Sequence, residues 1–417
     1  MTGAVGFRLA LGYANFRRFA LARFFSTLAW QMTGVAVGWQ IYALTHNALD
    51  LGLIGLAQFL PFLCLILPAG HVADRFDRRR VCLGAYAAEM FCPAALLIFS
   101  LLGGRAVWPV FVAMGAYGAG RAFWMPAGQA MLVNLVPEEV FPSAVGFSAI
   151  VFQVGAIMGP ALGGALFAVA DSITPGTGAA AVYATAILFW SMAIFYLWRI
   201  RTVSKAARSV GASLRDVFGG LRFVLSQQAL LGAISLDLFA VLFGGATALL
   251  PIYARDILHT DPTGLGLLRA APALGAAITA TALAWRPIRR RAGRWMFGGV
   301  LAFGVATILF GLSTSMWLSL GALFALGVGD MLSVFVRHLL VQLETPDHLR
   351  GRVSAVSSMF IGASNELGEF ESGVTARWWG PVPAVVVGGA ACIVVVVSYL
   401  RIFPMLRKLD QLRARGS

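Results

Sequence analysis

The sequence contains few charged residues. Asp, Glu, Lys and Arg together make up 12% of its 417 residues, whereas they make up about 25% of a typical soluble domain. Hydrophobic residues make up 59%. This composition excludes a water-soluble fold and predicts a chain that crosses a lipid bilayer several times.

The sequence also lacks the residue clusters that mark several kinds of site. Its four cysteines, Cys64, Cys82, Cys92 and Cys392, form no CxxC pair, and it has five histidines. We therefore expect no disulfide framework, no metal site and no cofactor. The absence of a GxxxxGK[ST] loop argues against a nucleotide-driven pump. A membrane-embedded enzyme or sensor would be an alternative, but no set of nucleophile and base and no long soluble segment supports it.

The net charge of +14 raises the possibility of nucleic-acid binding. The basic residues, however, lie in short connections between apolar segments and at the two ends, and aromatic residues are not interleaved with them. A nucleic-acid interface needs a continuous basic face. We therefore expect the lipid bilayer, and not nucleic acid, to be the macroscopic partner.

Hydrophobic segments recur along the whole chain. About 20 apolar residues are needed to cross the hydrocarbon core of a bilayer. Segments of this kind lie at 19–44, 51–73, 81–102, 107–130, 143–170, 178–198, 229–252, 264–285, 295–312, 316–340, 353–379 and 381–403. The sequence thus predicts an all-α membrane protein with twelve transmembrane helices.

Basic residues are distributed unevenly among the connections. Four of the five connections after even-numbered segments are rich in them, as at Arg78 to Arg80 and Arg289 to Arg291; the connection after 107–130 has none. The connections after odd-numbered segments hold only Arg105, Arg255 and Arg377. Basic loops of multi-pass proteins stay on the cytoplasmic side. Both termini are therefore predicted to be cytoplasmic.

The longest connection, residues 199–228, divides the chain into halves of six predicted helices, 1–198 and 229–417. It is basic, and part of it has one apolar side, formed by Leu214, Val217, Phe218, Leu221, Val224 and Leu225. We expect a cytoplasmic linker with an amphipathic helix on the inner membrane surface. The Arg78 to Arg80 triplet recurs 211 residues later, which is consistent with a duplicated six-helix unit.

The connection after the second segment carries a motif. From Gly70 the chain reads GHVADRFDRRR, with Gly70, Asp74, Arg75, Arg78 and Arg79 at fixed spacing. This spacing resembles the loop between helices 2 and 3 of the major facilitator superfamily of secondary transporters. The resemblance implies an inner gate in which Asp74 meets the start of segment 353–379 near Arg350 to Val353. Asp77 stands where the superfamily loop usually has Gly, which puts the tight turn there in question.

A second motif lies in segment 143–170. It has the spacing GxxxGPxxGG and consists of Gly155, Gly159, Pro160, Gly163 and Gly164. Glycines four residues apart let two helices approach closely, and Pro160 allows a kink. A packing helix would account for the glycines, but the whole pattern resembles the motif that the superfamily carries mainly in exporters. Residues 120–139, 250–258 and 345–356 are similar to the branch that contains siderophore (enterobactin) exporters and drug efflux proteins.

Acidic residues lie inside several predicted membrane segments. An ionisable group at the centre of such a segment costs roughly 2.5 to 3.5 kcal/mol, so its presence indicates a specific role. Carboxyl groups sheltered from water can serve as proton carriers. The proton-coupling candidates are Asp237, Asp330, Glu366 and Glu369. The alternative is that these acids only neutralise Arg121 and Arg337 in ion pairs.

Other polar and aromatic residues are candidates for contacts with a substrate. In the superfamily the first, fourth, seventh and tenth helices line a central cavity, and the expected cavity residues are Gln31, Gln40, Arg121, Trp124 and Asn365. Packing or a position at the membrane interface is the alternative for tryptophan. Arg337 and His338 lie near the end of their segment and are expected to be interfacial anchors.

The function that the resemblance implies is secondary active export of an amphiphilic organic molecule, a siderophore or a lipophilic drug. We expect proton antiport with alternating access and a monomeric protein. The alternative on the same fold is an importer or uniporter of a small organic solute or a metal chelate. No catalytic activity is expected.

Overall fold

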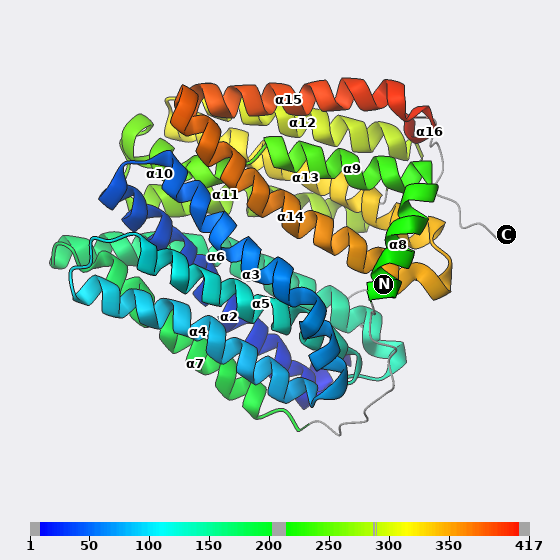
Figure 1. Cartoon of the computed structure of the whole chain (residues 1–417), viewed down its shortest axis with the longest axis horizontal. Coiled ribbons are helices and arrows are strands. Elements are labelled where there is room, and N and C mark those ends of the chain that lie inside the picture. Colours follow the sequence, from blue (N-terminus) through cyan, green and yellow to red (C-terminus); the bar gives the residue numbers. More distant parts are fainter. Residues whose placement is uncertain (1–8, 202–213, 287, 289, 408–417) are drawn as a thin grey trace. The chain divides into compact units, whose positions relative to one another are not determined.

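The computed structural model describes residues 9–201, 214–286, 288 and 290–407. This part of the chain folds into helices and contains no β-strand (Figure 1). The predicted class, a helical membrane protein, is confirmed.

Six long helices form the N-terminal part of the described chain. They are α2 (Ala14–Thr45), α3 (Ala48–Arg75), α4 (Arg78–Leu101), α5 (Trp108–Val133), α6 (Phe141–Ile173) and α7 (Gly178–Trp198). Each coincides with one predicted segment. Pro109 and Pro142 lie in the first turns of α5 and α6, where the missing proline N–H would have no helical partner anyway.

The C-terminal part begins with a shorter helix, α8 (Leu214–Ser226). The helices that follow are α9 (Gln228–Phe243), α10 (Leu250–Ile252), α11 (Pro262–Trp285), α12 (Ala292–Leu312), α13 (Met316–Glu344), α14 (Asp347–Trp379), α15 (Pro381–Ile402) and α16 (Pro404–Arg407). Gly380 separates α14 from α15 with a φ of 88°, a left-handed conformation that favours glycine.

Nine stretches of the described chain are long and apolar enough to cross a membrane. The helices α2, α5 and α14 are equally long but more polar, so they fall outside this set. They contain Gln31, Arg121 and Glu366, among other polar residues. A total of twelve membrane crossings therefore stays a prediction.

The predicted segment 229–252 is not one continuous helix. The helix α9 ends at Phe243, and a short 3₁₀ turn (Ala246–Leu249), α10 and a π-helical turn (Tyr253–Ile257) follow. Gly245 packs so closely against the backbone of Gly368 on α14 that a side chain there would overlap it. The break thus falls where Gly245 meets α14 and Gly244 meets the Phe303 ring of α12, and Pro251 then withholds one backbone donor.

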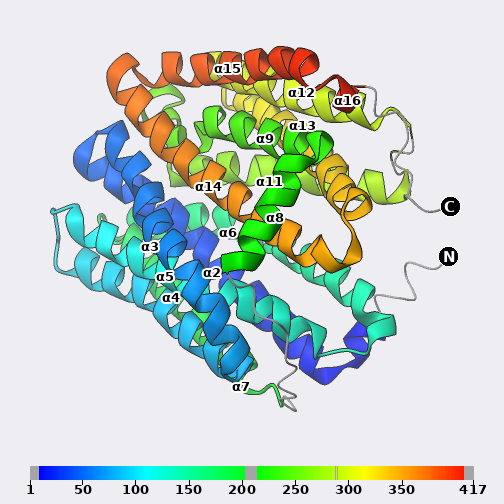
Figure 2. The ribbon, with the colours of Figure 1, turned by 45° about the vertical axis from the view of Figure 1, so that its right-hand side comes forward.

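The described chain forms two compact units. The first contains residues up to Leu44, Ala57 onward to the end of α7, and Asp261–Gly266; the second contains Thr45–Leu56 and the rest. In the first unit α4 packs against α5 and α7. In the second, α12 packs between α13 and α15, and α14 packs against α8 and α9 (Figures 1 and 2).

Glycine contacts explain why two short segments, Thr45–Leu56 and Asp261–Gly266, belong to a different unit from the residues that flank them in sequence. In the second unit, a Cβ at Gly52 would come within 3.0 Å of Gly373 Cα on α14. In the first unit, a Cβ at Gly164 would come within 3.1 Å of Gly266 Cα. Such glycine contacts let helix backbones approach closely.

The helix α8 occupies part of the predicted linker. Val224 is buried, and Leu221 packs against the same apolar cluster, which also contains Leu236 of α9 and Val353 of α14. Part of the apolar side of α8 is therefore used inside the second unit. Residues 202–213 of the linker lie outside the described residues.

The connection between α3 and α4 is much shorter than the motif suggested. The helix α3 continues to Arg75 and α4 begins at Arg78, so only Phe76 and Asp77 lie between them. The Asp77 side chain accepts a hydrogen bond of 2.9 Å from the backbone N–H of Arg79 and caps α4. Asp77 has a φ of −57°, so the turn needs no glycine at this position.

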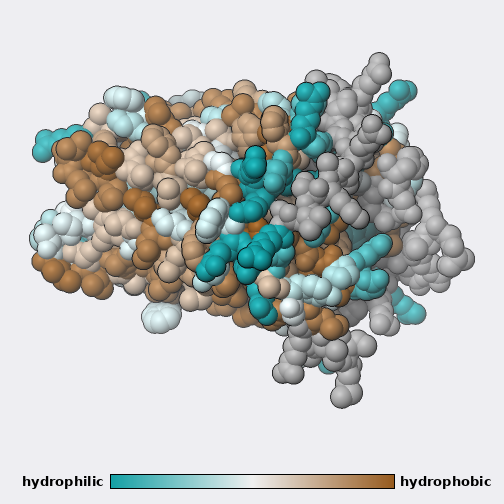
Figure 3. Space-filling view, turned by 90° about the horizontal axis from the view of Figure 1, so that it is seen from below, coloured by the Kyte–Doolittle hydropathy of each residue, from teal (hydrophilic) through white to brown (hydrophobic). Residues whose placement is uncertain are grey.

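Large apolar side chains are exposed on both units. Leu101, Ile173 and Trp317 are 70%, 77% and 83% exposed. Figure 3 shows one face of the molecule that is mostly apolar, with hydrophilic side chains gathered toward one end. Surface of this kind suits contact with lipid.

Candidate transport and coupling site

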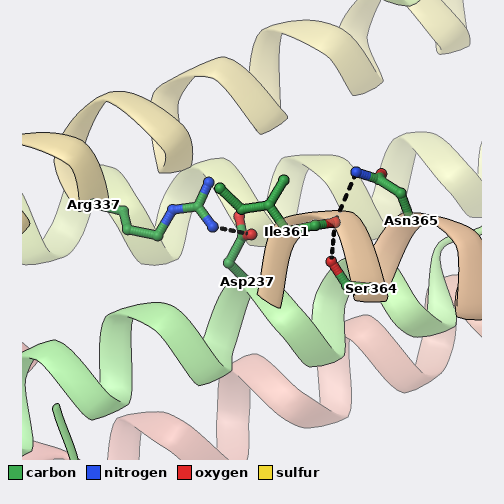
Figure 4. Close-up of polar contacts among 5 residues, drawn as sticks. All are labelled: Asp237, Arg337, Ile361, Ser364 and Asn365. Carbon is green, nitrogen blue, oxygen red and sulfur yellow. Dashed lines mark hydrogen bonds and ion pairs between the residues drawn. The ribbon is translucent and has the colours of Figure 1, made fainter. Parts of the chain in front are cut away.

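A buried ion pair lies in the second unit. The Arg337 guanidinium on α13 donates to the carboxylate of Asp237 on α9 (Figure 4). Their side chains are only 2% and 5% exposed. The expectation that Arg337 is an interfacial anchor is therefore wrong, because its side chain turns inward and meets an acid on a neighbouring helix.

A second acid lies beside this pair. Asp330 precedes Arg337 by seven residues on α13, which places both on the same side of the helix two turns apart. The charges of Asp237 and Arg337 both act on Asp330. The structure thus groups two of the four predicted proton-coupling residues around one arginine.

The other two candidates lie on α14. Glu366 is buried, and the Glu369 carboxylate lies against Gly55, where a Cβ would approach its Oε2 to 2.7 Å. The charge of Glu369 also acts on Arg269 of α11. Asn365 is exposed and its side-chain amide donates to the carbonyl oxygen of Ile361 at 2.9 Å (Figure 4).

In the first unit Arg121 is near an acid that the sequence did not single out. The Arg121 guanidinium lies 4.5 Å from the ring centroid of Phe62. Its charge acts on Glu89 of α4, which is 4% exposed. A Cβ at Gly120 would come within 2.7 Å of Glu89 Cγ, so α4 and α5 pack tightly here.

The expected cavity residues Gln31, Gln40 and Trp124 all make contacts within the first unit. Both ends of the Gln40 amide are engaged: its Nε2 donates to Ser100 Oγ at 2.9 Å, and its Oε1 accepts from the Tyr183 hydroxyl at 2.8 Å. Gln40 thus joins α2 to α4 and α7. The role of Gln31, Gln40 and Trp124 as cavity residues stays a prediction.

The glycines of the α6 motif pack against α2. A Cβ at Gly155 would come within 2.8 Å of Thr27, and one at Gly163 within 2.9 Å of Met32 Cα. Gly159 lies against Gln31 in the same way. Pro160 lies inside the helix. The spacing of four residues therefore produces one close helix contact along three turns.

Two arginines of the α3–α4 motif bind backbone carbonyl groups. Arg78 Nη1 donates to the carbonyl oxygen of Ala130 at 3.0 Å, and Arg79 donates to that of Trp198. Gly70, Asp74 and Arg75 lie on α3 itself. The side chain of Arg350, the expected partner of Asp74, lies outside the described residues.

Residues 10–416 match the family of transmembrane secretion effectors. The chain belongs to this family. The predicted resemblance to the major facilitator superfamily is confirmed, and the protein is a multi-pass membrane transporter and not an enzyme.

Several relatives of this secretion-effector chain are known. The multidrug efflux pump Tap of Mycolicibacterium fortuitum is 30% identical over 402 residues, which cover 91% of this chain and 93% of Tap. The enterobactin exporter EntS of Shigella flexneri is 25% identical, with 95% and 93% covered. The uncharacterised transporter YfiS of Bacillus subtilis is 28% identical, with 86% and 85% covered.

Solved transporter structures share the fold of this family member. A bacterial homologue of the human lysosomal transporter Spinster, inward-facing and unoccupied, matches with a TM-score of 0.71 at 14% identity and covers 94% of this chain and 95% of its own. A bacterial homologue of the iron transporter ferroportin matches with a TM-score of 0.68 at 17% identity, with 92% and 98% covered. At these identities the similarity concerns the fold alone.

Proposed function

We propose that this transporter exports an amphiphilic organic molecule, a siderophore or a lipophilic drug, across the bacterial inner membrane. The names of two relatives, an enterobactin exporter and a multidrug efflux pump, support this direction and this class of cargo. We further propose two six-helix halves, 1–198 and 229–417, joined by the linker 199–228, in a monomer that works by alternating access.

The proposal includes proton antiport, and one observation carries it. Asp237 forms a buried ion pair with Arg337 in the second unit, and the charges of both act on Asp330, two turns away on α13. When both acids are ionised the group has a net charge of −1, and one proton makes it neutral. Because a buried net charge is costly, proton uptake changes the relative free energies of conformations that expose or bury this group.

Transport in everted membrane vesicles tests direction and coupling together. For an exporter driven by proton antiport, acidifying the vesicle interior should drive accumulation of a lipophilic fluorescent dye, and a protonophore should abolish it. An importer would instead move the dye out of the vesicles, and a uniporter would show no response to the gradient. Vesicles without the protein serve as the control.

Asp330→Asn tests the coupling group. An amide keeps the shape of the side chain but takes up no proton, so accumulation driven by the pH gradient should fall to the level of empty vesicles. Exchange of labelled for unlabelled dye without a gradient should persist, because the binding site is retained. Asp171→Asn, at the end of α6, is the matched control. Full coupling in a stable Asp330→Asn protein would rule out Asp330 as the coupling residue.

The orientation of the chain is a separate prediction. A cysteine placed at Gly176, in the turn between α6 and α7, should react with a membrane-impermeant thiol reagent added to intact cells. A cysteine at Ser209, in the proposed cytoplasmic linker, should react only after the cells are opened. Both measurements use a Cys64→Ser background, because Cys64 is the exposed native cysteine. The opposite labelling pattern would reverse the topology.

A further inference from the structure

An arginine in the first unit lies among aromatic side chains. Arg23 is on α2, and its guanidinium carbon is 5.6 Å from the ring centroid of Trp124 on α5 and 5.6 Å from that of Phe152 on α6. Its Nη1 donates to Ser148 Oγ at 3.1 Å. Three helices therefore hold this one cationic group in place.

The surroundings of Arg23 are ordered by further contacts. Tyr86 of α4 stacks on Trp124 with a centroid distance of 5.9 Å and an interplanar angle of 13°. The Tyr86 hydroxyl is 3.2 Å from Ser26 Oγ, one turn along α2 from Arg23. The aromatic walls are thus fixed relative to the helix that carries the arginine.

Arg23 has no acidic partner in the part of the chain that the structure describes. Its one hydrogen bond goes to the neutral hydroxyl of Ser148, and its Nε is buried without an acceptor. By contrast Arg337 is paired with Asp237, and the charge of Arg121 acts on Glu89. A guanidinium carries five N–H donors, and inside a membrane protein a charge is normally neutralised.

We propose that Arg23 binds the anionic oxygen group, a carboxylate or phenolate, of the transported molecule. A planar guanidinium suits two-point binding of such a group. Trp124 and Phe152 lie within cation–π distance of it, and such apolar walls strengthen a charge-assisted hydrogen bond. Arg23 is partly exposed, and the N–H groups of its Nη atoms exceed the one that Ser148 accepts. The inference rests on the proposed export function and narrows the cargo to organic anions.

Two dyes that differ in one group test this inference. Rhodamine B carries a free carboxylate, and its ethyl ester does not. In everted vesicles we compare the transport rate of rhodamine B with that of its ester. This ratio should be at least tenfold lower in Arg23→Gln than in wild type, because transport of the acid slows while transport of the ester does not. Arg23→Lys should keep part of the preference, because it keeps the charge but not the planar pair of donors. Arg17→Gln, an exposed arginine on the same helix, is the control.

Direct binding separates a failure of this inference from a failure of the proposed function. Purified wild-type protein should bind rhodamine B more tightly than its ester, as measured by fluorescence polarisation, even if neither dye is transported. If Arg23→Gln does not fold, the same comparison is made with Arg23→Lys. An unchanged preference in these variants would overturn the inference. The second contradicting outcome concerns lipid. If the Arg23 variants lose bound phosphatidylglycerol, as seen by native mass spectrometry, while their dye binding is unchanged, the anion that Arg23 binds is a lipid headgroup and the inference is overturned.

Discussion

Asp237→Asn is expected to lower the free energy of unfolding by about 3 to 5 kcal/mol, the usual cost of leaving one partner of a buried ion pair uncompensated. The change leaves the Arg337 guanidinium buried at 2% exposure without the carboxylate that it binds. Thermal unfolding of the purified protein in detergent measures the effect. Glu138→Gln, in the turn before α6, removes an exposed acid and should leave the melting temperature unchanged.

A double variant shows whether the loss comes from the pair. Asp237→Asn combined with Arg337→Gln removes both charges, so its stability should recover to within about 1 to 2 kcal/mol of wild type. In the double-mutant cycle formed by wild type, the two single variants and the double variant, the coupling energy between Asp237 and Arg337 should then be large and attractive. Single variants as stable as wild type would mean that the pair contributes no net stability.

Gly327→Ala should be strongly destabilising. A methyl group at Gly327 on α13 would overlap the carbonyl oxygen of Pro272 on α11, and neither backbone can move without displacing its helix. Overpacking of this kind costs about 1 to 3 kcal/mol or more. We expect reduced yield of folded protein and a lower melting temperature, measured in detergent.

The same helix offers a matched control. Gly321, six residues earlier, has open space where a methyl group would go. Gly321→Ala should therefore be neutral, or stabilising by up to about 1 kcal/mol from the better helix propensity of alanine. Equal effects of the two substitutions would show that helix propensity, and not the contact between α11 and α13, governs this position.

Hydrophobic length alone predicted most of the helices, because a bilayer dictates how many apolar residues a crossing needs. The break after Phe243 was not predictable in this way. It depends on the contact of Gly245 with Gly368, and the two residues are far apart in sequence. The extension of α3 to Arg75 was also missed, since charged residues near a helix end look like a loop.

The candidate site was predicted in part. The acids Asp237 and Asp330 stood out because charges are rare in apolar segments, but their common partner Arg337 could not be identified without the packing of α9 against α13. Arg23 carried the same signal, a charge within a predicted span, and was overlooked. Glu89 is the one charged residue in segment 81–102, but only the tight packing of α4 on α5 shows that it lies close to Arg121.

The two-residue connection between α3 and α4 limits how these helices can move. Two residues reach at most about 7 Å when fully extended, and Asp77 is already committed to capping α4. The connection is therefore too short to allow much relative movement of the two helix ends. Sliding α3 along α4 by more than a turn would require unwinding one of them, whereas a tilt of both helices together leaves the connection unchanged. When the end of α3 moves, α4 must therefore move with it, together with the helices α5 and α7 that pack against α4.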